Sequence, residues 1–194
     1  MRFFILLSIY SLAIACGNGN NKTETQEPAP VKKDYFSVAD YIKGEINTID
    51  SLPVGILKKT IKASNKDSAF IEREEFRALA RVFTDPALEK KALEAKYAEH
   101  SFMDQTTGYY TFTYEPTASD APYQRIDVLV RPGETYSKVK SIYMAKSSSQ
   151  NDTTINERFY WKANNSFSIT KEKVYKNQTP VVDQLMVIWD PSAY

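Results

Sequence analysis

The sequence predicts an α+β domain in which about three N-terminal helices precede an antiparallel meander of six to seven strands. Two patterns predict this class. Between residues 38 and 97, apolar side chains recur at spacings of three and four, as they do on one face of a helix. From Ser101 onward, apolar and polar residues alternate, as they do in strands with one buried face. Helices followed by consecutive short strands favour α+β over a doubly wound sheet. One form of this architecture is a half-barrel, a curled sheet with helices over one face.

The first helix is expected to begin after Ser37. Ser37 can accept a hydrogen bond from the amide of Asp40, whose charge suits the positive end of a helix. Phe36 and Tyr41 have the spacing of a hydrophobic staple. The helix ends at the segment Ser51-Leu52-Pro53. Its expected apolar face comprises Val38, Tyr41, Ile42, Ile46 and Ile49.

Two further helices are expected after a solvent-facing strand over residues 54–63. The second runs from about Arg73 to Phe83, where apolar residues follow helical spacing. The third starts at Asp85-Pro86, an N-cap followed by proline at the first helical position, and continues to about Tyr97.

The strands are expected where apolar residues occur at every second position. Tyr110, Phe112 and Tyr114 share one face of such a strand, and Lys138 and Lys140 fall in phase with Ile142. The expected strands cover residues 101–105, 109–114, 124–131, 137–146, 155–162, 166–173 and 184–189.

The first sixteen residues predict export. Arg2 is followed by an apolar run from Phe3 to Ala15, which is too short for a stable membrane span but has the length of a signal-peptide core. Small residues before Cys16 resemble a bacterial lipobox, in which this cysteine becomes the acylated first residue. An uncleaved membrane anchor and a secreted protein with an unmodified cysteine are the alternatives.

The chain divides into three parts on this basis. Residues 1–15 are the predicted signal peptide, and residues 16–34 are the lipidated cysteine and a flexible tether. The tether is rich in Asn, Gly, Glu and Pro, and it has too few apolar residues to offset the entropy of ordering. Residues 35–194 are expected to form a single α+β domain, without disulfides because Cys16 is the only cysteine.

The composition argues against several classes of function. A net charge of +1 gives no basic field for nucleic acid, so no nucleic-acid partner is expected. The six glycines are scattered, which argues against a phosphate-binding loop. Neither the spacing of zinc ligands nor a calcium loop is found in the sequence, and no metal or other cofactor is expected.

Catalytic groups are sparse. His100 is the only histidine, without a nucleophile motif in the sequence, and it is interpreted as a surface residue. Glu74-Glu75 suits the first turn of a helix. Asp127 and Glu157 lie inside strands and could serve a hydrolase only if they met in one cleft.

Aromatic residues provide the candidate binding site. The chain has 13 Tyr, 10 Phe and 2 Trp, which is a large number for one domain, and most are explained by packing. If some line a groove, an apolar or glycan ligand would contact them. The candidate ligand-binding residues are Tyr110, Phe112, Tyr114 and Trp161.

The chain also resembles a group of bacterial lipoproteins. Its lipobox and Asn/Gly-rich tether are similar to those of Bacteroidota lipoproteins. The segments FMDQTTGYYTFTY and SIYMAKSSSQNDTTINERFYWKANNSFSI resemble uncharacterised small lipoproteins of that phylum. The resemblance implies the cell envelope, and within it the outer membrane, but brings no activity and no site residues. The acidic stretch that marks surface export in some members does not follow Cys16. Both the periplasmic side and the outer surface of the membrane are therefore alternatives for the domain.

These observations favour a lipid-anchored envelope protein whose domain is a non-catalytic module. The module would bind a ligand or dock onto an envelope complex. Its expected partners are the membrane, through the lipid at Cys16, and either an envelope protein or an apolar or glycan ligand. One alternative is a hydrolase of envelope glycans that uses Asp and Glu carboxylates. Another is an interaction protein whose sheet edge pairs with a partner strand.

Overall fold

The computed structural model describes residues 35–62, 65–133, 138–176 and 178–190. The signal peptide predicted over residues 1–15, and Cys16 with the tether predicted over residues 16–34, lie outside the described residues.

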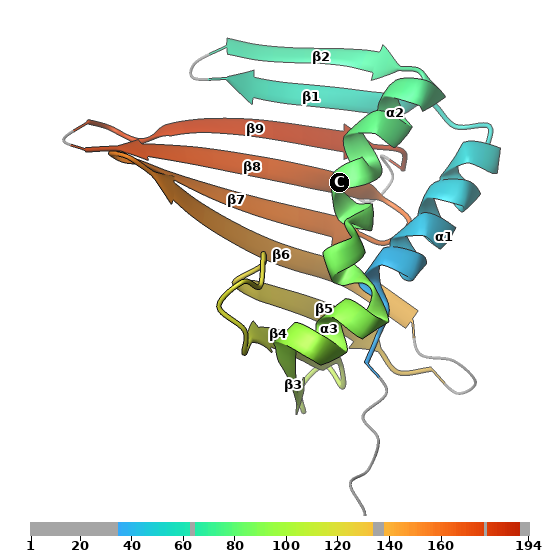
Figure 1. Ribbon diagram of the computed structural model, residues 1–194. Coiled ribbons are helices and arrows are strands. Elements are labelled where there is room, and N and C mark those ends of the chain that lie inside the picture. The colour runs from blue at the N-terminus through green and yellow to red at the C-terminus, as the bar shows by residue number, and fades with distance from the viewer. Residues whose placement is uncertain (1–34, 63–64, 134–137, 177, 191–194) are drawn as a thin grey trace, which may run out of the picture. The chain divides into compact units, whose positions relative to one another are not determined.

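Within the described residues, nine strands form one antiparallel sheet in the order β2-β1-β9-β8-β7-β6-β5-β4-β3 (Figure 1). Seven consecutive strands, β3 to β9, form a meander, and the β1–β2 hairpin extends it beside β9. The strands are β1 (Ile56–Lys62), β2 (Asn65–Ile71), β3 (Tyr97–Met103), β4 (Tyr110–Pro116), β5 (Arg125–Arg131), β6 (Lys138–Gln150), β7 (Thr153–Lys162), β8 (Ser166–Tyr175) and β9 (Val181–Ile188).

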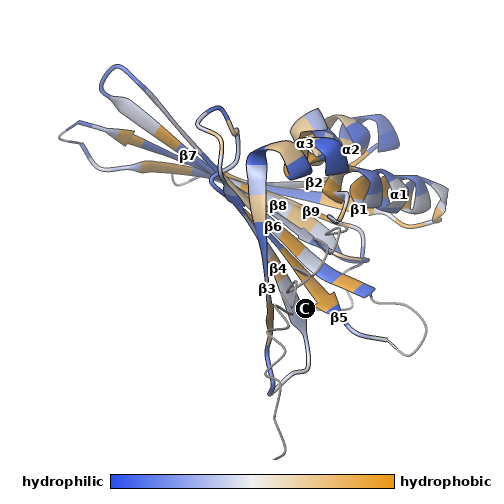
Figure 2. Ribbon diagram, turned by 60° about the horizontal axis from the view of Figure 1, so that its bottom comes forward, coloured by the Kyte–Doolittle hydropathy of each residue, from blue (hydrophilic) through white to orange (hydrophobic). Residues whose placement is uncertain are grey.

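The helices are short and lie together over one side of the sheet (Figure 2). We call the side that they cover the helix-facing side. The helical elements are α1 (Val38–Ser51), α2 (Arg73–Ala80), a 3-10 turn (Arg81–Thr84), a second 3-10 turn (Pro86–Leu88) and α3 (Lys90–Lys96).

The antiparallel sheet and the presence of both helices and strands are confirmed, but the predicted arrangement is wrong. The sequence pattern predicts about three helices before a sheet of six to seven strands. Instead, the β1–β2 hairpin separates α1 from α2 along the chain, and strands dominate the described residues. The described sheet is open, with edges at β2 and β3, so its strands do not close into a barrel.

Local sequence explains two of these differences. Strand β2 was not predicted because its residues from Asn65 to Phe70 are exposed on both faces, which removes the alternation that indicates a strand. The third helix is interrupted at Glu89, whose extended backbone (φ −73°, ψ 148°) separates the 3-10 turn from α3. Tyr97 then starts β3 rather than ending a helix.

The start of α1 is as predicted. Ser37 is the N-cap, and its hydroxyl oxygen accepts a hydrogen bond from the amide of Asp40 over 3.4 Å. The rings of Phe36 and Tyr41 lie 5.7 Å apart, as expected for a hydrophobic staple. The hydrogen bond of Ser37 and the ring contact of Phe36 therefore both fix how the chain enters α1.

The core lies between the helices and the sheet. Phe83, in the 3-10 turn after α2, contacts Trp161 of β7 at a ring distance of 5.2 Å and Phe167 of β8 at 5.1 Å. Trp161 and Phe167 stack with an interplanar angle of 14°. Aromatic burial of this kind supplies much of a small domain's stability.

Candidate functional site

A groove at the β3 edge of the sheet is the best candidate site. It has a volume of about 680 Å³, which is within the range of pockets for small organic ligands. Most of its lining is aromatic or aliphatic, with few polar groups. We call it the aromatic groove. Its lining residues are Tyr35, Phe36, Ser37, Lys90, Glu99, Tyr110, Phe112, Tyr114, Val130 and Val139.

One wall of the aromatic groove comes from alternate residues of β4. Tyr114 is fully buried, Phe112 is half-buried and Tyr110 is 37% exposed. Because side chains at every second position of a strand share a face, these three rings form a row. The row goes from the protein interior to the rim of the groove, so a ligand could enter at Tyr110 and contact the deeper rings.

The opposite wall comes from the residues just before α1. The backbone N–H of Phe36 donates a hydrogen bond to the phenolic oxygen of Tyr114 over 3.1 Å. The hydroxyl of Tyr35 donates to the carbonyl of Tyr97 over 3.0 Å, and the rings of Tyr35 and Tyr114 lie 5.6 Å apart. These contacts hold residues 35 and 36 against β3 and β4, so this wall is anchored.

A β-bulge supplies the aliphatic part of the groove. The register of β5 and β6 shifts between Leu129 and Val130, so that Val130 pairs with Val139. An extra residue in one strand reverses the side on which the following side chains lie. Val139 therefore lines the groove, whereas regular alternation predicts Lys138 and Lys140 in phase with Ile142.

The side chains that line the groove have a formal net charge of zero at neutral pH. Lys90 and Glu99 are the lining residues with opposite charges. Burial raises the pKa of Tyr114; the hydrogen bond from Phe36 works against this shift and the Glu99 carboxylate adds to it. The phenol therefore stays neutral at physiological pH and keeps its proton for hydrogen bonding.

Three of the four predicted ligand-binding residues line this groove. Tyr110, Phe112 and Tyr114 come together there, but Trp161 does not. Trp161 is fully buried in the core between Phe83 and Phe167. Sequence reasoning missed Tyr35 and Phe36 because no local pattern indicates that the segment before α1 packs against β4.

The carboxylates considered for hydrolysis do not converge. Asp127 is on the side of the sheet away from the helices, where it accepts hydrogen bonds from Thr113 and Arg125. Glu157 is in phase with buried Phe159 on the helix-facing side and forms an ion pair with Lys171. Residues on opposite sides of one sheet cannot share a cleft.

The remaining candidates are at the surface, as interpreted from the sequence. The side chain of His100 is largely exposed and lies 3.9 Å from Glu115. Glu75 pairs with Lys58, and Glu74 pairs with Arg77 in the first turns of α2. These contacts are explained by surface electrostatics alone.

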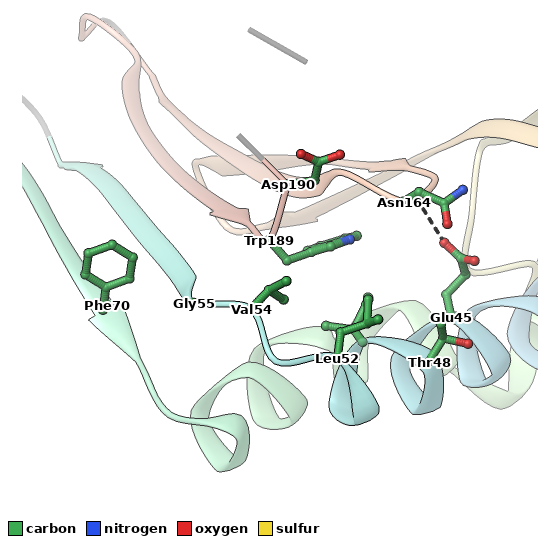
Figure 3. A pocket seen from close by; sticks show the side chains of 10 residues that line it. Glu45, Thr48, Leu52, Val54, Gly55, Phe70, Asn164, Trp189 and Asp190 are labelled. Atoms are coloured by element: carbon green, nitrogen blue, oxygen red, sulfur yellow. Dashed lines mark hydrogen bonds between the residues drawn. The ribbon is translucent and has the colours of Figure 1, made fainter. Parts of the chain in front are cut away.

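A second pocket of about 500 Å³ lies between α1 and the sheet, near the start of β1. Figure 3 shows Phe70 on one side of it, Glu45 and Asn164 on the other, and Trp189 between them. The carboxylate of Glu45 accepts a hydrogen bond from the backbone N–H of Asn164 over 3.1 Å. Asp190 also lines this pocket, so two carboxylate residues that the sequence did not single out occur here together.

The described residues contain neither a cluster of metal ligands nor a helix suited to span a membrane. No group of three or more His, Cys, Asp or Glu in this part of the chain is arranged to hold a metal ion. Across the same residues, no helix has both the length and the apolar character that crossing a bilayer requires.

Comparison with known proteins found no match to any family model, any curated protein or any solved structure. The aromatic groove must therefore be interpreted from its own chemistry. Its apolar walls can exclude water from a ligand, its aromatic faces can stack, and its lining includes one basic and one acidic residue.

Proposed function

We propose that this protein is a lipid-anchored envelope module that binds a ligand with an apolar chain in the aromatic groove. The observation that carries the proposal is the row of Tyr110, Phe112 and Tyr114, which is closed on the opposite side by Tyr35 and Phe36. The function is non-catalytic binding, with acylation at Cys16 holding the domain at the membrane.

The physical basis is burial of methylene groups. Each buried CH₂ contributes about 0.8 kcal/mol, so about six would contribute on the order of 5 kcal/mol before the costs of association. The half-buried Phe112 and the aliphatic Val130 and Val139 offer the surface for such a chain. An acyl chain fits this lining better than a glycan, because hydroxyl groups of a sugar need more polar partners than Ser37, Lys90 and Glu99 provide.

Native mass spectrometry tests ligand binding. The acylated protein is purified from envelopes in mild detergent, and bound small molecules are detected after the detergent is removed in the gas phase. We expect a bound species with an acyl chain in the parent protein. Phe112→Glu places a charge in the groove and should abolish the bound species.

Tyr160→Glu is the matched control, because Tyr160 is 41% exposed on the other side of the sheet. This variant should keep the ligand. A parent protein without any bound molecule, a species that survives Phe112→Glu, or a bound glycan would each contradict the proposal.

The anchor is tested separately by metabolic labelling with an alkyne-bearing fatty acid. The parent protein should incorporate the label and Cys16→Ala should not, because Cys16 is the only cysteine. Labelling of the Cys16→Ala variant, or an unlabelled parent, would contradict lipidation at this residue.

Hydrolysis of an envelope glycan is the second candidate function, and the pocket with Glu45 and Asp190 is the observation that favours it. A glycosidase needs two carboxylates on either side of the scissile bond. Release of reducing ends from envelope glycans, abolished by both Glu45→Gln and Asp190→Asn, would support this candidate. Absence of turnover in the parent protein would remove it.

A further inference from the structure

The tip of the β3–β4 hairpin carries large apolar side chains that face solvent. Phe102 is 69% exposed, Met103 is 43% exposed and Tyr110 is 37% exposed. The strand register pairs Met103 with Tyr110 and Phe102 with Thr111, so the three side chains lie on the last two rungs before the turn. Single exposed apolar residues are ordinary, but a group at one tip indicates an interaction site.

These side chains lie on both sides of the hairpin. Met103 and Tyr110 are in phase with the groove residues on the helix-facing side, whereas Phe102 points to the opposite side. A protein partner that covered one side of the sheet would leave the other apolar group in water. An apolar phase entered by the tip would cover both groups at once.

The turn itself carries little charge. Asp104 is the one residue of 104–109 of a type that is charged at neutral pH, and its carboxylate is already bonded within the turn. It accepts hydrogen bonds from the amide of Thr106 over 2.8 Å and from the hydroxyl of Thr107 over 2.9 Å. Because this carboxylate already has hydrogen-bond donors within the turn, moving the turn close to lipid costs less desolvation free energy than it would for an unpaired charge.

The β6–β7 hairpin shows that an apolar tip is not a general property of this sheet. Residues 147–154 at that tip read Ser-Ser-Ser-Gln-Asn-Asp-Thr-Thr, and the tip projects beyond the helices (Figure 1). The two hairpins have the same connectivity but opposite surface chemistry. The polar tip of the β6–β7 hairpin suits water, whereas the apolar tip of the β3–β4 hairpin suits an apolar environment.

The first described residues of the domain indicate which apolar phase is available to the tip. Residues 35–37 line the same groove as Tyr110, so the described part of the chain begins beside this hairpin. A tether over residues 16–34 would have a root-mean-square span of roughly 20–25 Å. This step rests on the proposed acylation of Cys16, which would hold the groove end of the domain near the bilayer surface.

We propose that the tip of the β3–β4 hairpin is a membrane-contact element. Phe102, Met103 and Tyr110 enter the interfacial region of the bilayer that holds the lipid anchor. Aromatic side chains favour this region because their rings are apolar and a tyrosine hydroxyl stays at the polar boundary. Tyr110 also forms the rim of the groove, so the contact opens the groove toward the lipid surface.

Quenching by brominated lipids tests this contact. The acylated full-length protein is reconstituted into phosphatidylethanolamine–phosphatidylglycerol vesicles with and without brominated acyl chains. Phe102→Trp provides a reporter at the tip. Phe70→Trp is the matched control, because Phe70 is 77% exposed on β2, at the other edge of the sheet.

The native Trp161 and Trp189 are buried and supply a constant background that the parent protein measures. We expect the additional emission of Phe102→Trp to shift to the blue in vesicles and to be quenched by brominated lipid, while that of Phe70→Trp is unaffected. Absence of quenching in Phe102→Trp, or equal quenching in both variants, would overturn the proposal.

The two proposals fail in different experiments. Absence of a bound acyl species in native mass spectrometry would contradict ligand binding in the groove. Absence of quenching would contradict membrane contact at the tip. Mass measurement of the acylated chain before reconstitution confirms that the anchor is present in each variant.

Discussion

The backbone N–H of Phe36 donates a hydrogen bond to the hydroxyl of Tyr114, which lies 78 positions later in the chain. The bond joins the segment before α1 to the centre of β4, and both residues line the aromatic groove. The groove therefore depends on a tertiary contact between the start of the domain and the middle of its sheet. Any change that releases residues 35 and 36 should open one wall.

Tyr114→Phe should destabilise the domain and loosen the groove. The substitution keeps the ring but leaves the part-buried N–H of Phe36 without its acceptor, which costs about 1 kcal/mol. Chemical denaturation measures the change in unfolding free energy. Tyr160→Phe, which removes a hydroxyl from an exposed ring, should change stability by less than about 0.5 kcal/mol. Equal effects in the two variants would contradict the role of the Phe36–Tyr114 bond.

Trp161→Phe should reduce stability and leave the ligand bound. Trp161 is fully buried and packs against Phe83 and Phe167, so the smaller ring leaves a void that costs about 1–3 kcal/mol. Denaturation gives the stability change, and native mass spectrometry of the folded variant gives ligand occupancy. Loss of the ligand without a change in unfolding free energy would show that Trp161 contributes to ligand binding.

Asp85→Asn should make the free energy of unfolding less dependent on pH in the acid range. Partial burial alone would raise the pKa of Asp85, but the amide of Ala87 and the ammonium of Lys146 lower it overall. Because the folded-state pKa lies below the unfolded value of about 3.9, the carboxylate stabilises the fold above that pH. This stability is lost as the pH falls through the folded-state pKa.

The unfolding free energies of the parent and Asp85→Asn should therefore differ by about 1 kcal/mol from pH 5 to 8, since asparagine keeps the cap but not the charge. The difference should shrink below about pH 4. Denaturation curves across this range provide the measurement. A difference that stays constant down to pH 2 would show that the charge of Asp85 does not contribute.

Gly108→Ala should destabilise the β3–β4 turn, whereas Gly44→Ala should stabilise α1. Gly108 has a φ of +70°, which costs a residue with a Cβ about 1–2 kcal/mol, although the space around it is open. Gly44 is exposed in a regular helix, also with open space, so alanine should contribute about 0.5–1 kcal/mol there. Thermal or chemical unfolding checks both signs. A neutral Gly108→Ala would show that the turn adopts another conformation.

Local signals in the sequence predicted those parts of the fold that depend on neighbouring residues. The cap at Ser37, the staple of Phe36 and Tyr41, and the alternation in β4 each act within a few positions, and the structure contains all three. Alternation also predicts that Tyr110, Phe112 and Tyr114 share one face, and these three residues line the groove.

Other features depend on distant or irregular contacts and were missed. The bulge between Leu129 and Val130 changes the side on which Val139 lies, and period-two alternation cannot show an extra residue. Strand β2 forms because β1 provides an edge for pairing, although residues such as Lys66 and Asp67 have no buried face. Trp161 has the same alternation as a groove residue, and only the position of Phe83 shows that it belongs to the core.

Photocrosslinking in living cells can show whether an acyl chain occupies the aromatic groove. A benzophenone amino acid replaces Phe112 in the groove or, as the control, Tyr160 on the other side of the sheet. After irradiation, the protein is purified and its adducts are identified by mass spectrometry. We predict that the groove position captures a small molecule with an acyl chain and that the control position does not. Adducts of the same kind at both positions, or none in the groove, would contradict the account.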